Sequence, residues 1–110
     1  MIARTWRGTT KAETAEAYLE YLKRTGLAGY RATPGNLATF ALLSRGEERA
    51  EFLLVTLWES MDAVKAFAGP EPDRAVFYPE DDHFLIERGE RVEHFDVVFA
   101  STGELASSSR

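Results

Sequence analysis

The segment Phe52-Leu53-Leu54-Val55-Thr56-Leu57-Trp58 is the feature of this sequence that most constrains its fold. Successive residues of a strand point to opposite faces, so a strand of this composition presents apolar side chains on both sides. Each side then needs a cover. The chain has only 110 residues, so its own helices can cover one face. A second subunit is the leading candidate for the other.

Length and composition predict one globular domain. The chain has 45% hydrophobic and 28% charged residues, which is ordinary for a globular protein, and 110 residues are too few for two cores. We expect the domain to cover residues 1–99. Residues 100–110 are small and polar, so they are predicted to form a disordered tail.

Charge and cysteine content exclude several classes of function. The net charge is -5, and nine of the eighteen acidic residues fall between Glu71 and Asp96, so binding to nucleic acid is not expected. The chain has no cysteine, no recognisable signal peptide and no run long enough to span a membrane. A cytoplasmic location without membrane attachment is therefore predicted.

The first third of the chain reads as a strand followed by a helix. A strand is predicted over residues 2–7 and ends at Gly8. Thr10 and Glu13 have the spacing of a capping box, and apolar residues then recur at helical offsets. A helix is therefore predicted from this box to Gly26, because glycine is a common helix stop.

The middle third reads as a hairpin and a second helix. Residues 29–36 are predicted to be an irregular connection. Leu37–Leu43 and Phe52–Trp58 are predicted to pair as antiparallel strands across an exposed turn. Ser60 is a typical helix cap, and the helix that it begins is predicted to end near Gly69, because two prolines follow.

The last third predicts two short helical segments and a strand. Asp73–Phe77 is predicted as a short helical turn, Tyr78–Leu85 as a second helical segment, and Arg91–Phe99 as the final strand. Within the second segment, only Glu80 and His83 could converge on a metal ion, and two ligands do not make a site. The acidic residues there are predicted to lie in the solvent-exposed first turn of a helix, so no metal site is expected.

The resulting order β-α-β-β-α-β predicts an α+β fold of the ferredoxin-like type, with a four-stranded sheet and helices on one face. The other face of the sheet would expose a large apolar patch. A homodimer in which two sheets pack face to face covers this patch with one self-complementary surface. A higher assembly or a partner protein is the alternative.

The segment Leu57-Trp58-Glu59-Ser60-Met61-Asp62-Ala63-Val64-Lys65-Ala66-Phe67, within a chain of this layout, resembles the antibiotic biosynthesis monooxygenase family. In that family a strand ends in Trp-x-Ser and is followed by a short helix that carries an aromatic residue. The resemblance covers residues 1–99 in layout. It implies a dimeric α+β barrel, with activities that include cofactor-independent oxygenation of aromatic molecules and haem degradation.

Haem degradation is disfavoured because the residues that it uses in the family are missing. The haem-degrading members carry an Asn on the first strand, a Trp on the helix and a His about ten residues later. At the matching positions this chain has Trp6, Phe67 and Phe77. The resemblance therefore implies no axial iron ligand, and no cofactor is expected.

The residues that could bind a small molecule lie on the first strand and in the second half of the chain. Arg4 and Trp6 share a strand face, and Phe67, Phe77, Tyr78 and His83 are the further candidates for an aromatic-walled cleft. Arg4 and Tyr78 could polarise a quinol or bind a carboxylate. Trp6, Phe67 and Phe77 could equally be core residues.

His94 is the candidate proton carrier. It shares a strand face with Asp96, and a carboxylate beside an imidazole fixes its tautomer and raises its basicity. A half-exposed histidine beside a solvated charge is the alternative interpretation. His83, on an acidic helix, also fits a surface position.

Two hypotheses of different class follow. The first is a monooxygenase that uses no bound flavin, nicotinamide or metal and acts on an electron-rich aromatic small molecule. In it His94 with Asp96 takes a proton, Arg4 and Tyr78 stabilise the anion, and aromatic side chains hold the ring. The second is a non-catalytic dimeric domain that binds a small ligand or has a stress-related role. An open cleft in which Arg4, Tyr78 and His94 converge within hydrogen-bond reach would support the enzyme. A cleft filled by Trp6 and Phe67 would argue against the enzyme and leave the second hypothesis.

Overall fold

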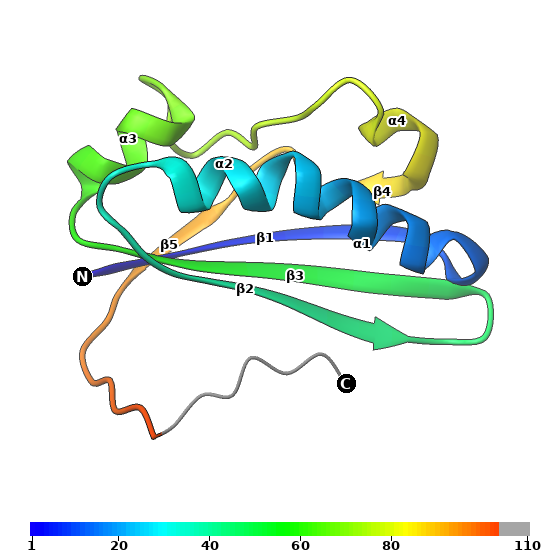
Figure 1. Ribbon diagram of the computed structural model, residues 1–110, viewed down its shortest axis with the longest axis horizontal. Helices are drawn as coiled ribbons and strands as arrows, with labels where there is room; N and C mark the ends of the chain where they lie inside the picture. Colours follow the sequence, from blue (N-terminus) through cyan, green and yellow to red (C-terminus); the bar gives the residue numbers. More distant parts are fainter. Residues whose placement is uncertain (104–110) are drawn as a thin grey trace.

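The computed structural model describes residues 1–103 and has one sheet covered by helices on one side (Figure 1). Strand β1 (Ile2–Lys11) lies between β3 (Arg49–Trp58) and the pair β4 (Leu85–Arg88) and β5 (Glu93–Asp96), and β2 (Asn36–Arg45) forms the other edge. All pairings are antiparallel. Since β4 and β5 share one edge of β1, they act as a single interrupted fourth strand. The predicted ferredoxin-like α+β class is confirmed.

The register of β1 and β3 separates a covered face from an open face. Ile2 pairs with Trp58, Arg4 with Thr56 and Trp6 with Leu54, and all six side chains face the helices. Most of this face is buried, with Trp58 and Thr56 almost completely enclosed. The core of the protein therefore lies between this face and the helices.

The opposite face of the sheet is apolar and has no cover within the chain. Leu53, Val55 and Leu57 of β3 are half-buried there, and they pair with side chains of β2 on the same face. Phe40 and Leu42 of β2 are exposed, as is Phe95 of β5. We call this surface the open face. The predicted two-sided apolar character of Phe52–Trp58 is therefore present in the structure.

Strand β1 is four residues longer than predicted, and the predicted capping box is wrong. Thr10 pairs with Ala50 as a buried strand residue. Gly8 lies within the strand and does not end it. A Cβ at this position would lie 2.4 Å from the ring of Trp6, so the glycine makes room for that indole. The helical region begins with a 3-10 turn (Ala12–Thr14), and its N-cap Lys11 makes no side-chain hydrogen bond.

The first helical region continues past the predicted stop. Helix α1 (Ala15–Arg24) breaks only at Thr25, and α2 (Gly26–Ala32) then occupies the first half of the predicted irregular connection. At the end of α1, the Thr25 hydroxyl donates a hydrogen bond to the Tyr21 carbonyl. Tyr30 of α2 is buried in the core, so packing overrides the helix-breaking tendency of the glycines.

Helix α3 (Met61–Ala68) follows the prediction closely. The Ser60 side chain accepts a hydrogen bond from the Ala63 amide at 3.2 Å, and Gly69 ends the helix with φ of 89°. Both predicted signals therefore act as expected.

Residues 70–80, which we call the covering segment, contain no helix, so the predicted helical turn at Asp73–Phe77 is wrong. Here the backbone pairs with residues 89–92, the connection between β4 and β5. Ala75 donates to the Glu90 carbonyl, and Val92 donates to the Asp73 carbonyl, both at 2.8 Å. These bonds extend the chain across the helical side of the sheet.

The end of the domain also differs from the prediction. Helix α4 (Asp81–Phe84) is shorter than the predicted helical segment, because residues 85–88 form β4. The predicted strand Arg91–Phe99 is present only as β5, and Val98 and Phe99 beyond it are exposed. Residues 100–103 have no helix or strand, and the rest of the predicted tail lies outside the described residues.

Replacing Ser60 with alanine is expected to lower the free energy of unfolding by about 1 kcal/mol, because the amide of Ala63 loses its acceptor. Urea denaturation followed by circular dichroism measures the change. The matched control is Ser44→Ala, an exposed strand position, which should change stability by less than about 0.5 kcal/mol. Equal losses in the two variants would contradict the assigned cap.

Candidate functional site

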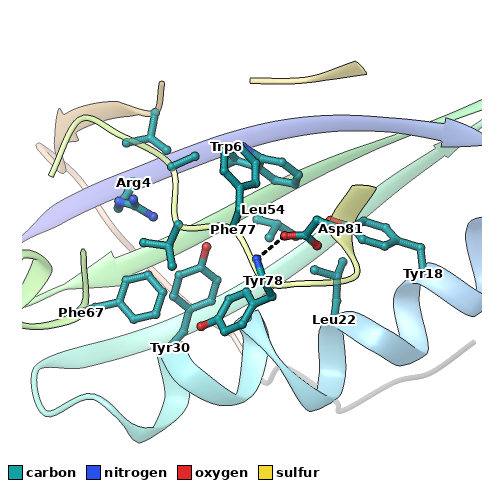
Figure 2. Close-up of a pocket in the computed structure, with 14 residues that line it drawn as sticks. Arg4, Trp6, Tyr18, Leu22, Tyr30, Leu54, Phe67, Phe77, Tyr78 and Asp81 are labelled. Atoms are coloured by element: carbon teal, nitrogen blue, oxygen red, sulfur yellow. Dashed lines mark hydrogen bonds between the residues drawn. The ribbon is translucent and has the colours of Figure 1, made fainter. Parts of the chain in front are cut away.

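A cavity lies between the covered face of the sheet, the helices and the covering segment (Figure 2). Its walls come from β1, β3, α1, α2, α3, the covering segment and the turns that flank β4. Five of the eight predicted site residues line it: Arg4, Trp6, Phe67, Phe77 and Tyr78. The fold thus brings together residues that are up to 74 positions apart in the sequence.

The cavity is nearly filled by its own walls. Its volume is about 20 Å³, which is room for about one water molecule. Sites for small organic ligands usually measure roughly 300–1,000 Å³. An aromatic ligand can therefore enter only if part of the cavity wall moves. The open cleft that we expected for an enzyme is not present in this closed arrangement.

The aromatic wall is held by specific contacts. The Trp6 indole donates to the Gly89 carbonyl at 2.6 Å and meets the Phe77 ring edge-on, with 6.3 Å between centroids. The rings of Tyr30 and Phe67 lie 4.6 Å apart. Arg88 lies over Phe77, with 4.5 Å to the ring centroid. The wall is therefore aromatic and largely apolar, and it suits an aromatic ligand.

Arg4 is the cationic group of the cavity and is only 2% exposed. Its Nη2 donates to the Arg74 carbonyl at 3.2 Å, and its guanidinium lies 5.7 Å from the centroid of Phe67. Its Nε has no hydrogen-bond partner. Burial lowers the pKa of Arg4, and nearby Tyr30 opposes that shift. Since an arginine stays protonated in proteins, a buried positive charge faces the cavity.

His94 lies beside Arg4, because the two residues are direct partners in the β1–β5 ladder. Its Nδ1 is 3.2 Å from the Asp73 carboxylate, and its Nε2 is buried without a partner. Burial lowers the pKa of His94, the charge of Arg4 lowers it further, and Asp73 opposes both effects. The imidazole is therefore neutral at neutral pH.

The predicted partner of His94 is replaced by another carboxylate. Asp96 shares the strand face of His94 but is exposed, and Asp73 of the covering segment makes the contact. A carboxylate 21 residues earlier in the chain cannot be found from strand alternation. The position of Asp73 depends on the backbone hydrogen bonds between the covering segment and the connection between β4 and β5.

Asp81 is a cavity residue that sequence reasoning missed, since we expected a solvated carboxylate. It is 4% exposed, and its carboxylate accepts from the Tyr78 amide at 2.6 Å. The Asp81 amide donates back to the Tyr78 carbonyl. An acidic residue three positions after an aromatic one, with proline between them, is the signal that could have revealed this hydrogen-bonded turn before α4. Burial raises the pKa of Asp81.

Tyrosines that the sequence did not single out complete the cavity. Tyr18 and Tyr30 line it, and the hydroxyl of Tyr21 accepts from the Glu80 amide at 2.9 Å. Burial raises the pKa of Tyr30 and of Tyr78, so both remain phenols that can donate a hydrogen bond.

His83 is exposed on α4 and does not line the cavity. Its predicted role in ligand binding therefore finds no support in its position. Among residues 1–103, no three His, Cys, Asp or Glu side chains gather closely enough to hold a metal ion. None of the helices in this part of the chain has the length and apolar character needed to cross a membrane.

Three solved structures share this fold over nearly their whole length. A Bacillus cereus protein named for the antibiotic biosynthesis monooxygenases is 16% identical, with 93% of this chain and 97% of that chain covered and a TM-score of 0.64. The haem degrader MhuD from Mycobacterium tuberculosis, with two haems bound in its active site, is 20% identical, with 93% and 100% covered and a TM-score of 0.61. A Nitrosomonas europaea protein of unknown function is 18% identical, with 94% of each chain covered and a TM-score of 0.57.

No curated protein matches the sequence. At these levels of identity, the structural neighbours support the fold alone. The family model described as antibiotic biosynthesis monooxygenase matches residues 1–74. This match covers β1 to β3, helix α3 and the Arg4 to Phe67 part of the cavity. The chain therefore belongs to the antibiotic biosynthesis monooxygenase family.

Proposed function

We propose that this protein is a cofactor-independent monooxygenase that acts on an electron-rich aromatic small molecule. The observation that carries the proposal is the cavity itself, in which a buried guanidinium with an unpartnered Nε faces an aromatic wall. A buried cation without a carboxylate partner favours a ligand that develops negative charge. Family membership makes oxygenation the leading reaction class.

The side chains divide into three roles. Trp6, Phe67 and Phe77 hold the aromatic ring, since their own rings form the wall. Arg4 stabilises the anion that forms when the substrate loses a proton, and the Tyr78 phenol donates a hydrogen bond to it. His94 takes the proton; it neighbours the cavity residue Arg4 on the sheet, does not itself line the closed cavity, and is held by Asp73 and not by Asp96.

The reaction balances without a cofactor for a substrate with a reactive methylene group. Loss of one proton gives a delocalised carbanion, which transfers electrons to molecular oxygen. One oxygen atom forms the new C=O bond, and the other leaves as water with the two hydrogens of the methylene group. The substrate supplies all four electrons that dioxygen accepts.

The residues of this cavity do not fit haem, although the neighbour MhuD holds it. No histidine or cysteine lines the cavity. Burial keeps Tyr30 and Tyr78 protonated, and iron binds tyrosine as the phenolate. His94 lies outside the wall, with its Nδ1 at Asp73. We therefore propose no iron-dependent step.

A homodimer through the open face is part of the proposal, in agreement with a dimeric α+β barrel. Phe40, Leu42 and Phe95 are exposed there beside the half-buried leucines and valine of β3. A two-fold pair of such faces removes both from water. A cytoplasmic location also stays a prediction, since the chain has no cysteine.

A non-catalytic ligand-binding domain, including one with a stress-related role, is the second candidate function. The small volume of the cavity counts against the enzyme, because Trp6 and Phe67 occupy space that a substrate would need. In this alternative the covering segment closes over a ligand that is bound but not changed.

Oxygen uptake with a panel of hydroquinones and anthrones tests the enzyme. We expect protein-dependent uptake with at least one compound and a fall of about 100-fold in Arg4→Met, because the anion loses its charged donor. Arg31→Met, at an exposed position of α2, is the matched control and should retain full activity. Absence of uptake across the whole panel would leave only the ligand-binding alternative.

Light scattering at micromolar concentration tests the dimer. The wild-type protein is expected to show twice the chain mass, and Leu42→Glu is expected to weaken self-association tenfold or more, which corresponds to about 1.4 kcal/mol. Ile86→Glu is the matched control, because Ile86 is exposed on β4, at the opposite edge of the sheet from Leu42 on β2. A monomer mass for the wild-type protein would exclude the homodimer.

A further inference from the structure

The covering segment is attached to the rest of the protein in two different ways. At residues 73–75 it is held by hydrogen bonds between backbone groups, which join it to the connection between β4 and β5. At residues 78–81, which we call the closing turn, side chains hold two backbone amides. The Tyr78 amide donates to the Asp81 carboxylate at 2.6 Å, and the Glu80 amide donates to the Tyr21 hydroxyl at 2.9 Å. The second attachment therefore depends on the chemical state of side chains.

The closing turn keeps the ring of Tyr78 at the cavity wall. Tyr78 and Asp81 both line the cavity, and in Figure 2 the Tyr78 ring points from the covering segment toward the helices. A Cβ at Gly29 of α2 would lie 3.0 Å from the Tyr78 hydroxyl and 3.2 Å from the Phe67 ring, so the glycine makes room for the phenol. Release of the turn would move Tyr78 away from α2 and uncover the cavity.

Asp81 is a buried carboxyl that forms no ion pair within residues 1–103. Arg88 is the cation that acts on it, but the Arg88 guanidinium is bonded to Asp82 at 2.7 Å. A buried charge without an ion-pair partner is costly, so burial favours the neutral form of the carboxyl. The closed position of Asp81 and its ionisation therefore oppose each other.

Groups from five elements act on this carboxyl. They are Tyr18 and Tyr21 of α1, Tyr30 of α2, Tyr78 of the covering segment, Asp82 of α4 and Arg88 of β4. Burial raises the pKa of Asp81 and the charge of Asp82 adds to this effect, while the Tyr78 amide, Arg88 and the Tyr18 hydroxyl oppose it. The pKa is raised overall, so burial outweighs the hydrogen bonds.

The direction of the pH dependence follows from this raised pKa. When the turn opens, Asp81 reaches water and its pKa returns to the ordinary value of a carboxyl. The closed turn therefore binds the proton more tightly than the open turn, and opening releases a proton. Asp81 favours closure fully below the ordinary pKa, and this contribution is lost as the pH rises through the raised pKa.

We propose that residues 78–81 form a pH-dependent gate of the cavity, in which neutral Asp81 keeps the turn closed and ionised Asp81 favours its opening. A neutral carboxyl still accepts the hydrogen bond of the Tyr78 amide through its carbonyl oxygen, so closure does not require the charge. On opening, the proton passes to solvent and the ionised carboxylate becomes hydrated. The gate controls access to the cavity, whatever reaction takes place inside.

Hydrogen exchange of backbone amides, followed by two-dimensional NMR, tests the gate without a substrate. The measured quantity is the protection factor, in which the exchange rate of an unstructured chain at the same pH is divided by the observed rate. Between about pH 5 and about pH 7, we expect the protection of the Tyr78 and Glu80 amides to fall about threefold or more. The Ala75 amide, held by the Glu90 carbonyl, is the internal control and should keep its protection.

Asp81→Asn removes the titrating group and keeps an acceptor of the same shape. In this variant we expect the protection of the Tyr78 amide to be independent of pH and higher than in the wild type at about pH 7, because no charge is buried. Glu80→Gln is the matched control, since it removes one negative charge from an exposed side chain of the same turn. It should follow the wild type.

The carboxyl carbon resonance of Asp81 gives a readout that requires no variant. We expect it to titrate above the ordinary aspartate pKa of about 3.9. Titration at or below that value would overturn the gate, as would wild-type protection that does not fall with pH, an equal fall at Ala75, or an unchanged pH dependence in Asp81→Asn. None of these measurements involves oxygen, so the gate and the monooxygenase stand or fall separately.

Discussion

The alternation of side chains along β1 and β3 is the constraint on which the rest of the structure depends. Because the two strands pair without a shift over their full length, every second residue of β1 faces the helices. The same alternation that buries Trp6 also buries Arg4, which cannot reach water from its position. The burial of its apolar neighbours therefore keeps this cation in the core. Exposing Arg4 to water would require the packing of the sheet against the helices to be broken.

The parts of the fold that depend on local chemistry could be predicted from the sequence. The strand at Phe52–Trp58, the cap at Ser60 and the stop at Gly69 each carry a signal within a few residues. Helix α2 and the end of β1 could not, because local glycine and threonine signals were overridden by packing of Tyr30 and Trp6. Tertiary contacts outweigh propensity where a large side chain is buried.

The residues of the candidate site also divide into those that the sequence predicts and those that it does not. Arg4, Trp6, Phe67, Phe77 and Tyr78 were found because aromatic and basic residues recur on predicted inner faces. Asp73 and Asp81 were not, because both lie in a stretch whose acidic composition indicates solvent. The first contacts His94 through a backbone pairing between distant segments, and the second is buried by a turn that its own carboxylate closes. Composition alone does not distinguish such carboxylates from surface charge.

Hydrogen bonds hold the covering segment in place at two points along its length. Residues 73–75 are hydrogen-bonded to residues 90–92 in the connection between β4 and β5. The turn at residues 78–81 is closed by the bonds between Tyr78 and Asp81 and is hydrogen-bonded to Tyr21 of α1. Only Val76 and Phe77 lie between these attachments. Entry of the ligand that we propose would require these hydrogen bonds to break first, as in other gated sites. Its association would then be slower than diffusion allows, and the enclosed molecule would stay for many times the lifetime of an open encounter.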